Sequence, residues 1–280
     1  MPSTSTPISQ TFDRLRAERS MAFMPFITAG DPDVGVTQRL ILELAARKVD
    51  LIEIGFPYSD PIADGPVIQA SYTRALGRQI RVEQIFAAVG ELSADAGGAA
   101  LPPLVAMVSY AIIFRMGSAQ FVREARAAGF SGLIVPDLPA EEAEDLSTLA
   151  TAQGLDLVQL VAPTTPPERI QRILETSRGF LYCISVAGTT GVRDQLPEEL
   201  KAQLQWLKSR SSLPLAVGFG ISRPEQVHEL RGLADGVIVG SALVRQVAAI
   251  SDQGLSVETA VNNVGALAAR FVAATQQTSG

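Results

Sequence analysis

The feature that most constrains the fold is a regular alternation of short apolar runs with amphipathic segments along most of the chain. Each run has the length of a strand and is mostly aliphatic or β-branched, which predicts buried β-strands. The runs are Ala22–Thr28, Leu51–Ile54, Leu104–Val108, Leu133–Val135, Leu157–Val161, Phe180–Ile184, Leu215–Val217 and Gly236–Val239. Strands that alternate with helices indicate a parallel sheet with right-handed crossovers. Eight such units in about 250 residues predict an α/β fold, a single (β/α)8 TIM barrel.

Amphipathic helices are predicted between these runs, because three sets of apolar residues keep the spacing of one buried helix face. They are Val82, Ile85, Phe86, Val89 and Leu92; Leu40, Ile41 and Leu44; and Leu200, Leu204 and Leu207. Ser222, followed by Pro224 and Glu225, predicts a helix that starts with Ser222 as its cap. An extra N-terminal helix at Gln10–Glu18 is expected to close the bottom of the barrel, and Gly240-Ser241 is expected to open a short helix after the eighth strand.

The predicted organisation is one domain over residues 1–280, with loose tails at 1–8 and 276–280. No linker, charge run or low-complexity block interrupts residues 20–275. A doubly wound open sheet is the rival architecture. It is disfavoured because Gly30-Asp31-Pro32, and not G-x-G-x-x-G, follows the first predicted strand.

Composition excludes several classes of function. The net charge is −6 with no cluster of Lys and Arg, which argues against a nucleic-acid-binding protein. The apolar stretches are too short to span a bilayer. Cys183 and His228 are the only residues of their kinds, so neither an internal disulfide nor a zinc site is expected, and both are interpreted as structural. Trp206 is expected to cover a helix face, and a reducing cytoplasm is the expected location.

Carboxylates gather at the end of the second predicted strand. Glu53 alternates with Ile52 and Ile54, so it faces the opposite side of the sheet, where burying a carboxylate is costly. Asp60 and Asp64 follow in a proline-rich loop. Either aspartate alone is equally well explained as a turn or cap residue. Together with Glu53, they predict an acid/base site at the mouth of the barrel.

Glycine-rich loops follow the last three predicted strands, at 187–191, 218–222 and 240–241. Glycine lets backbone N–H groups approach an anion closely, and a helix N-terminus favours negative charge. TIM barrels frequently bind phosphate with the loops after strands 7 and 8. The residues by themselves therefore predict a barrel enzyme that acts on a small phosphorylated substrate by carboxylate acid/base catalysis.

Two motifs resemble the tryptophan synthase alpha subunit family closely. The first combines residues 24–32 (MPFITAGDP) with residues 53–66 (EIGFPYSDPIADGP). The second combines Gly218-Phe219-Gly220-Ile221 with Pro224-Glu225-Gln226-Val227, and Gly240-Ser241-Ala242 follows. The resemblance spans roughly residues 10–270. It implies aldol cleavage of indole-3-glycerol phosphate to indole and glyceraldehyde 3-phosphate in tryptophan biosynthesis.

The resemblance also implies roles for individual residues. Glu53 matches the family's general acid/base, and Asp64 matches the carboxylate that holds the indole N–H. Tyr182 matches a tyrosine near that glutamate, although ordinary barrel packing explains a tyrosine there nearly as well. The implied phosphate ligands are Gly191, Gly220, Gly240 and Ser241. The implied indole pocket contains Phe26, Phe219 and Thr190, with Ser185–Gln195 as a lid.

No metal or cofactor is implied for this chain, because the indole ring itself accepts the electrons of the broken bond. The implied partner is the tryptophan synthase beta subunit in an α2β2 assembly, with pyridoxal phosphate held only by beta. Asp60, Pro61, Asp137 and Pro139 match positions near that interface, although Pro139 is equally well explained as a helix start.

Two departures from the family pattern bear on the partner and the lid. Ala111 stands where the family usually has Asn, and Val186 stands where some members have Arg. They motivate one alternative, a stand-alone indole-3-glycerol-phosphate lyase that releases indole. Two more alternatives are a non-catalytic barrel partner and another phosphate-binding barrel enzyme. Retention of both Glu53 and Asp64 argues against a non-catalytic partner. The third usually needs a Lys or an Asp/Cys pair at strand ends, whereas Lys48 is expected on a helix.

Overall fold

The eight predicted strands form one closed parallel barrel in chain order, which excludes the open sheet. The computed structural model describes residues 5–61, 64–95, 101–184, 197–218 and 220–276. The strands are β1 (Ala22–Thr28), β2 (Ile52–Gly55), β3 (Leu104–Met107), β4 (Phe130–Ile134), β5 (Asp156–Val161), β6 (Leu181–Ile184), β7 (Leu215–Gly218) and β8 (Gly236–Val239). The bounds of β1 and β8 are as predicted. The start of β4 lies three residues before the predicted Leu133.

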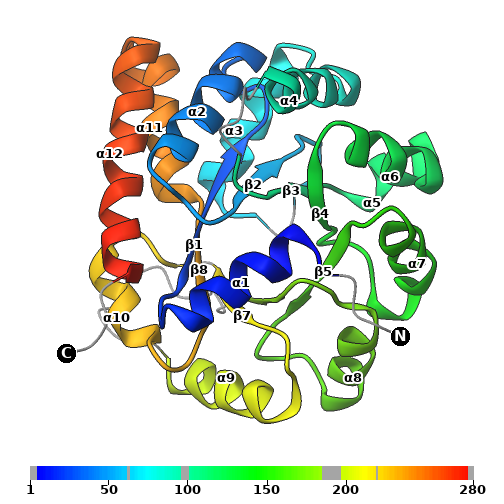
Figure 1. The fold of residues 1–280 in the computed structure, drawn as a ribbon. Coiled ribbons are helices and arrows are strands. Elements are labelled where there is room, and N and C mark those ends of the chain that lie inside the picture. Colours follow the sequence, from blue (N-terminus) through cyan, green and yellow to red (C-terminus); the bar gives the residue numbers. More distant parts are fainter. Residues whose placement is uncertain (1–4, 62–63, 96–100, 185–196, 219, 277–280) are drawn as a thin grey trace.

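Helices surround the barrel, as Figure 1 shows. They are α1 (Pro7–Ala17), α2 (Val34–Ala46), α3 (Pro66–Gly77), α4 (Val82–Asp95), α5 (Tyr110–Met116), α6 (Ser118–Ala127), α7 (Glu144–Ala152), α8 (Pro167–Thr176), α9 (Glu198–Arg210), α10 (Val227–Leu230), α11 (Ser241–Gln253) and α12 (Val257–Gln276), with 3₁₀ turns η1 (Ala140–Glu142) and η2 (Pro224–Gln226). The three predicted apolar stripes lie on α2, α4 and α9. Their residues face the core, although Val82 and Leu92 are only partly buried.

Two helix starts differ from the prediction. Arg223, not Ser222, precedes η2. The side-chain carbonyl of Gln226, not Glu225, accepts hydrogen bonds from the backbone N–H groups of Ser222 and Arg223 at 2.9 and 3.0 Å. The helix that opens at Ser241 is α11, and it runs for 13 residues to Gln253. It is longer than predicted because its buried residues keep helical spacing as far as Ala249.

Side chains alternate strictly between the inside and the outside of the barrel, as strand geometry requires. Leu51 and Tyr182 belong to the inner apolar cluster, whereas Ile52, Ile54 and Cys183 belong to the outer layer between strands and helices. Glu53 shares the face of Leu51 and therefore points into the barrel. The thiol of Cys183 is buried, and burial raises its pKa to about 12, in keeping with the structural role expected for it.

Helix α1 lies across one end of the barrel (Figure 1). Its residues Ile8, Phe12 and Leu15 are buried in the inner cluster, and the Phe12 and Phe180 rings lie 5.7 Å apart. The helix therefore plugs the amino ends of the strands, as predicted. The predicted loose tail 1–8 is wrong for Pro7 and Ile8, because Ile8 is fully buried. At the other end of the chain, Gln276 is the last residue of α12 and not part of a tail.

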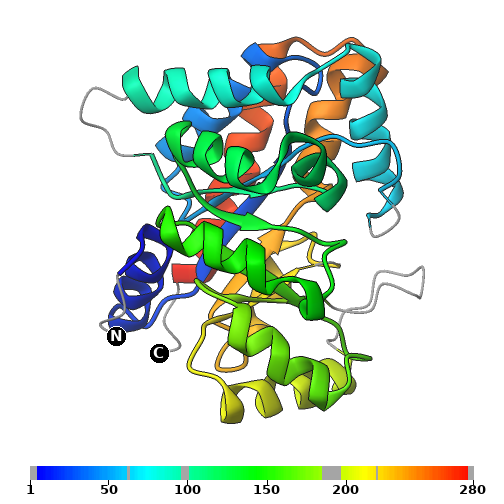
Figure 2. The same cartoon turned by 90° about the vertical axis from the view of Figure 1, so that its right-hand side faces the viewer.

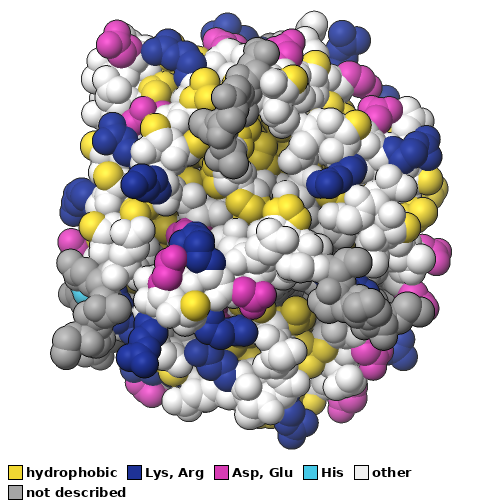
Figure 3. Space-filling model, in the orientation of Figure 1, with side chains coloured by type: hydrophobic (Ala, Val, Ile, Leu, Met, Phe, Trp, Pro, Cys, Tyr) yellow, Lys and Arg dark blue, Asp and Glu magenta, His cyan; other side chains and the backbone are white. Residues whose placement is uncertain are grey.

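The two ends of the barrel differ in the residues that they carry. Figure 2 shows α1 at one side of the molecule, near both chain termini. The α1 face, seen in Figure 3, carries Lys and Arg side chains interspersed with Asp and Glu. No helix in the described ranges is long and apolar enough to cross a bilayer. The carboxyl ends of the strands lie away from α1. The described residues predicted to act in catalysis and phosphate binding lie at these ends and in the loops that follow them.

Candidate active site

Glu53 is the most unusual residue inside the barrel. It lies on β2 opposite Phe26 of β1 and Val105 of β3, and only 1% of it is exposed. Neither carboxyl oxygen has a hydrogen-bond partner among the residues that the structure describes. Burial raises the pKa of Glu53 well above its ordinary range, and the nearby Asp64 carboxylate raises it further. A carboxyl group that is costly to bury and has no hydrogen-bond partner in the described structure indicates a catalytic acid rather than a structural residue.

Asp64 lies beside Glu53 at the mouth of the barrel. Burial raises its pKa to about 6, while a hydrogen bond from the Tyr58 hydroxyl opposes that rise. The side chain of Gln69 on α3 donates to the backbone carbonyls of Asp64 and Pro61 at 2.7 and 3.2 Å, which ties this loop to the helix. The two predicted carboxylates are thus brought together, with different degrees of burial.

Two glycines make room for tyrosine side chains at this end. A Cβ on Gly218 of β7 would collide with the Tyr182 ring and hydroxyl. A Cβ on Gly55 of β2 would collide with the Phe26 ring and would lie 2.7 Å from the Tyr72 hydroxyl. Burial raises the pKa of Tyr182 well above its ordinary range, and Glu53 is the first charged neighbour that adds to it. Tyr182 therefore lies near Glu53 and keeps its proton.

The Phe26 ring lies between the carboxylates and the last glycine loop. It would meet a Cβ on Gly55 at one side, and a Cβ on Gly240 would lie 3.5 Å from it at the other. Gly240 precedes α11, whose first turn begins at Ser241 and has no side-chain cap. Helix N-termini of this kind present free N–H groups that suit a phosphate. The Phe26 ring thus lies between the strand that carries Glu53 and the glycine loop predicted to bind phosphate.

Gly220 lies in the adjoining loop after β7 with φ +83°, a left-handed conformation that glycine adopts without strain. Its carbonyl accepts a hydrogen bond from the Gln226 side chain at 3.3 Å. Other predicted positions lie outside the described residues: Gly191, Thr190, Phe219, the lid segment 185–195 and Val186 within it.

The rim beyond the site carries an exposed apolar residue. Phe114 on α5 is 73% exposed. Asp137 fixes the start of α5, because its carboxylate accepts hydrogen bonds from the Ser109 hydroxyl at 2.6 Å and the Tyr110 backbone N–H at 2.7 Å. Asp60 and Ala111 are exposed at this end, and Pro139 directly precedes η1.

Three residues of the site escaped the sequence prediction: Tyr58, Gln69 and Tyr72. Tyr72 lies on the buried stripe of α3 with Ile68, Ser71 and Ala75, where only it and Ser71 carry a polar group. A tyrosine on such a stripe is a usable signal, because a buried hydroxyl normally finds a partner. Gln69 and Tyr58 offered no comparable pattern.

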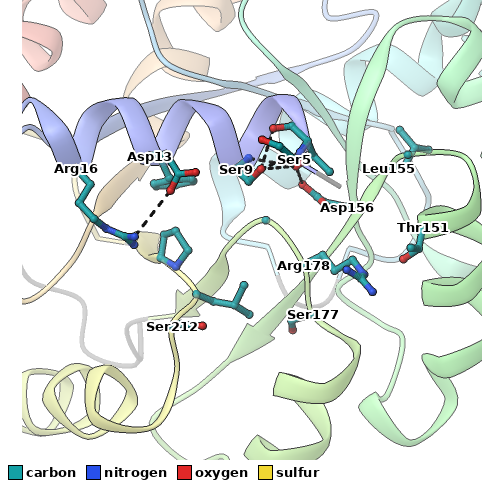
Figure 4. A pocket seen from close by; sticks show the side chains of 16 residues that line it. Ser5, Ser9, Asp13, Arg16, Thr151, Leu155, Asp156, Ser177, Arg178 and Ser212 are labelled. Atoms are coloured by element: carbon teal, nitrogen blue, oxygen red, sulfur yellow. Dashed lines mark hydrogen bonds and ion pairs between the residues drawn. The ribbon is translucent and has the colours of Figure 1, made fainter. Parts of the chain in front are cut away.

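A pocket lies beside α1, at the end of the molecule opposite the candidate site (Figure 4). It has a volume of about 340 Å³ and is lined in part by Asp13, Arg16, Asp156 and Arg178. The Asp156 carboxylate accepts a hydrogen bond from Thr6 at 2.6 Å and thereby holds the start of α1. None of the predicted site residues lines this pocket. In the described ranges, no group of three or more His, Cys, Asp and Glu side chains is placed to hold a metal ion.

Known proteins match both the sequence and the fold. The family model described as "Tryptophan synthase alpha chain" matches residues 12–275. A tryptophan synthase alpha chain from Rhodopirellula baltica is 46% identical over 265 residues, 93% of this chain and 95% of that one. The crystal structure of the alpha subunit from Legionella pneumophila is 35% identical, with a TM-score of 0.86 and coverage of 96% of this chain and 98% of that one. One chain of the tryptophan synthase complex from Pyrococcus furiosus is 34% identical, with a TM-score of 0.80 and coverage of 91% and 98%.

Proposed function

The chain belongs to the tryptophan synthase alpha chain family, and from that premise we propose how its residues carry out the reaction. The chain is a lyase of L-tryptophan biosynthesis that cleaves indole-3-glycerol phosphate to indole and glyceraldehyde 3-phosphate. Its partner is the tryptophan synthase beta subunit. The observation that carries the proposed roles is Glu53, a buried carboxyl whose two oxygens both lack a partner.

Glu53 is the general acid/base of the cleavage. Burial raises its pKa well above the ordinary range and so favours the protonated form, from which one oxygen can deliver a proton to indole C3. The other oxygen accepts the proton of the glycerol hydroxyl as the carbonyl of the aldehyde forms. The bond between indole C3 and the glycerol carbon breaks, its electrons return to the ring, and Glu53 ends in the protonation state in which it began.

Asp64 holds the indole N–H and stabilises the positive charge that protonation at C3 puts on the ring. This role requires the carboxylate form, which predominates at neutral pH with a pKa of about 6. Glu53 and Asp64 thus divide the work as a neutral acid and a carboxylate. Environments that separate two such groups are typical of acid/base pairs. Tyr182 forms a polar wall beside Glu53.

The substrate phosphate is held by backbone N–H groups at the start of α11, at Gly240 and Ser241, and Gly220 and Gly191 serve as its further ligands in this proposal. The indole ring packs on Phe26, whose ring lies between Gly55 and Gly240, and Phe219 and Thr190 complete the pocket in this proposal. Chemistry at a TIM barrel's carboxyl ends, with phosphate bound after the last strands, follows the general arrangement of such enzymes.

The beta subunit binds at the rim that carries Phe114, with Asp60, Pro61, Asp137 and Pro139 around it. An exposed aromatic side chain on a rigid, capped helix suits the centre of an interface. The assembly is an α2β2 tetramer. We place the protein in the cytoplasm, in keeping with its buried free thiol.

The test is a comparison of Glu53→Gln with Glu142→Gln, which changes an exposed glutamate of η1 outside the site. Glu53→Gln should lower kcat for indole release by at least about 10²-fold, since general acid/base catalysis typically contributes 10²–10⁴-fold. Binding of inorganic phosphate should be unchanged in both variants. Near-normal turnover of Glu53→Gln would overturn the assignment.

A further inference from the structure

Tyr72 is a buried polar residue that the roles above do not use. It lies on α3 with 1% of its surface exposed, and no hydrogen-bond partner reaches its hydroxyl. In the described residues, five buried side-chain atoms lack a hydrogen-bond partner. Three of them are the Tyr72 hydroxyl oxygen and the two carboxyl oxygens of Glu53. All three lie at the carboxyl end of the barrel.

The Tyr72 hydroxyl lies close to Gly55, on the inner face of β2 that also carries Glu53. It is 2.7 Å from the position that a Cβ on Gly55 would occupy, and Gly55 is the next inward-facing residue after Glu53 on β2. The Tyr58 ring packs on the Tyr72 ring with centroids 5.5 Å apart. Burial raises the pKa of Tyr72, and the charges of Asp64, Tyr58 and Glu53 raise it further. The hydroxyl therefore lies one inward-facing position beyond Glu53 along β2, at the carboxyl end of the barrel.

Tyr72 is held rigidly in that position. The preceding residue, Ser71, is joined to Thr28 of β1 by a hydrogen bond of 2.6 Å between their hydroxyls. Two residues on, Arg74 forms two hydrogen bonds to the buried Asp31 carboxylate at 2.9 and 2.7 Å. The helix is thus fixed to the loop and strand on both sides of Tyr72.

Packing does not explain the hydroxyl. Phenylalanine would fill the same volume, and a buried hydroxyl without a partner costs about 1–3 kcal/mol. A fixed, unpartnered donor beside an unpartnered acid is the arrangement expected where a ligand completes the hydrogen bonds.

We propose that Tyr72 is a further catalytic residue, whose O–H donates a hydrogen bond to the glycerol hydroxyl oxygen that Glu53 deprotonates. The proposal rests on the role proposed for Glu53. The transferred proton goes from that hydroxyl to Glu53, and Tyr72 keeps its own proton while it stabilises the negative charge that develops on the oxygen. Burial raises the pKa of Tyr72 well above its ordinary range, so the donor proton is present throughout the working pH range.

The experiment compares Tyr72→Phe with Tyr110→Phe, which removes a phenol on α5 outside the carboxyl cluster. Tyr72→Phe should lower kcat for indole release roughly 10- to 100-fold, at or below the loss seen for single oxyanion donors. Its thermal midpoint should stay the same or rise. Binding of indole-3-propanol phosphate, which has the ring and the phosphate but no glycerol hydroxyls, should be unchanged. Tyr110→Phe should match the parent chain.

Two results would overturn the proposal. Parental kcat in Tyr72→Phe would show that the hydroxyl makes no contact in the transition state. Weaker binding of indole-3-propanol phosphate would show that the substitution distorts the pocket and that Tyr72 acts in packing. Glu53→Gln, measured in parallel, distinguishes failure of this proposal from failure of the role proposed for Glu53. If Glu53→Gln is inactive and Tyr72→Phe is fully active, only the role of Tyr72 is refuted. If both variants are active, the role of Glu53 is refuted as well.

Discussion

Removing the Tyr58 hydroxyl should move the acid limb of the pH–rate profile. The reaction requires Asp64 as a carboxylate, so kcat/KM should fall as pH decreases through its pKa of about 6. The Tyr58 hydrogen bond stabilises the charged form and lowers that pKa. Tyr58→Phe should therefore raise the pKa of Asp64 and shift the loss of activity to higher pH.

The magnitude follows from the strength of this hydrogen bond. Bonds to charged groups contribute about 1.5–3 kcal/mol, and a site that is partly open to solvent belongs at or below the lower end. One pKa unit corresponds to about 1.4 kcal/mol, so the expected shift is about one unit. At pH 6 the ionised fraction of Asp64 would then fall from about one half to about one tenth, which predicts a loss of roughly fivefold in kcat/KM. At pH 8 the two proteins should differ by only about 10%.

The assay is indole release at low substrate concentration between pH 5 and 9, with Tyr110→Phe as the control. Tyr110 lies at the same end of the barrel, and Asp64 is not among the groups that its backbone and ring contact. An acid limb that stays in place in Tyr58→Phe would refute the reasoning, as would an equal loss of activity at every pH.

Three further variants test the site and its surroundings. Glu53→Met should abolish turnover yet raise stability by about 1–3 kcal/mol in urea unfolding, because it removes two unpartnered buried oxygens; a destabilised variant would contradict this. Gly240→Val should raise KM at least roughly tenfold with a smaller effect on kcat, because a side chain blocks the N–H groups that bind phosphate; an unchanged KM would move the phosphate site elsewhere. Phe114→Ser should weaken association with the beta subunit by about 1–2 kcal/mol in a titration, and unaltered affinity would place the interface on another surface.

The strands and the inward direction of Glu53 could be predicted because both follow from local pattern. Apolar runs of strand length identify the barrel, and the period of two places Glu53 opposite Ile52 and Ile54. The meeting of Glu53 with Asp64 also follows, because their separation along the chain is short and Asp64 belongs to the loop that begins where β2 ends. These predictions needed no knowledge of how the helices pack.

Residues on helices could not be placed in this way. Whether the buried stripe of α3 meets the barrel mouth depends on the angle at which the helix packs, so the pattern could single out Tyr72 but could not place it near Glu53. The Ser/Thr/Pro-rich start predicted a tail, yet Thr6 caps α1 and bonds to Asp156, 150 residues away. That contact buries Ile8, and only the tertiary structure shows it. The clearance that Gly55 gives to the Phe26 ring and Gly218 gives to the Tyr182 ring is likewise a property of neighbouring strands.

The most direct test of the central claim is single-turnover release of indole from indole-3-glycerol phosphate, by the parent chain and Glu53→Gln, each without and with saturating beta subunit. The parent chain should cleave slowly alone and much faster with beta. Glu53→Gln should be slower by at least about 10²-fold in both conditions. Equal rates for the two proteins would contradict the assignment of the acid/base to Glu53, and a parent rate indifferent to beta would contradict the coupling of this site to its partner.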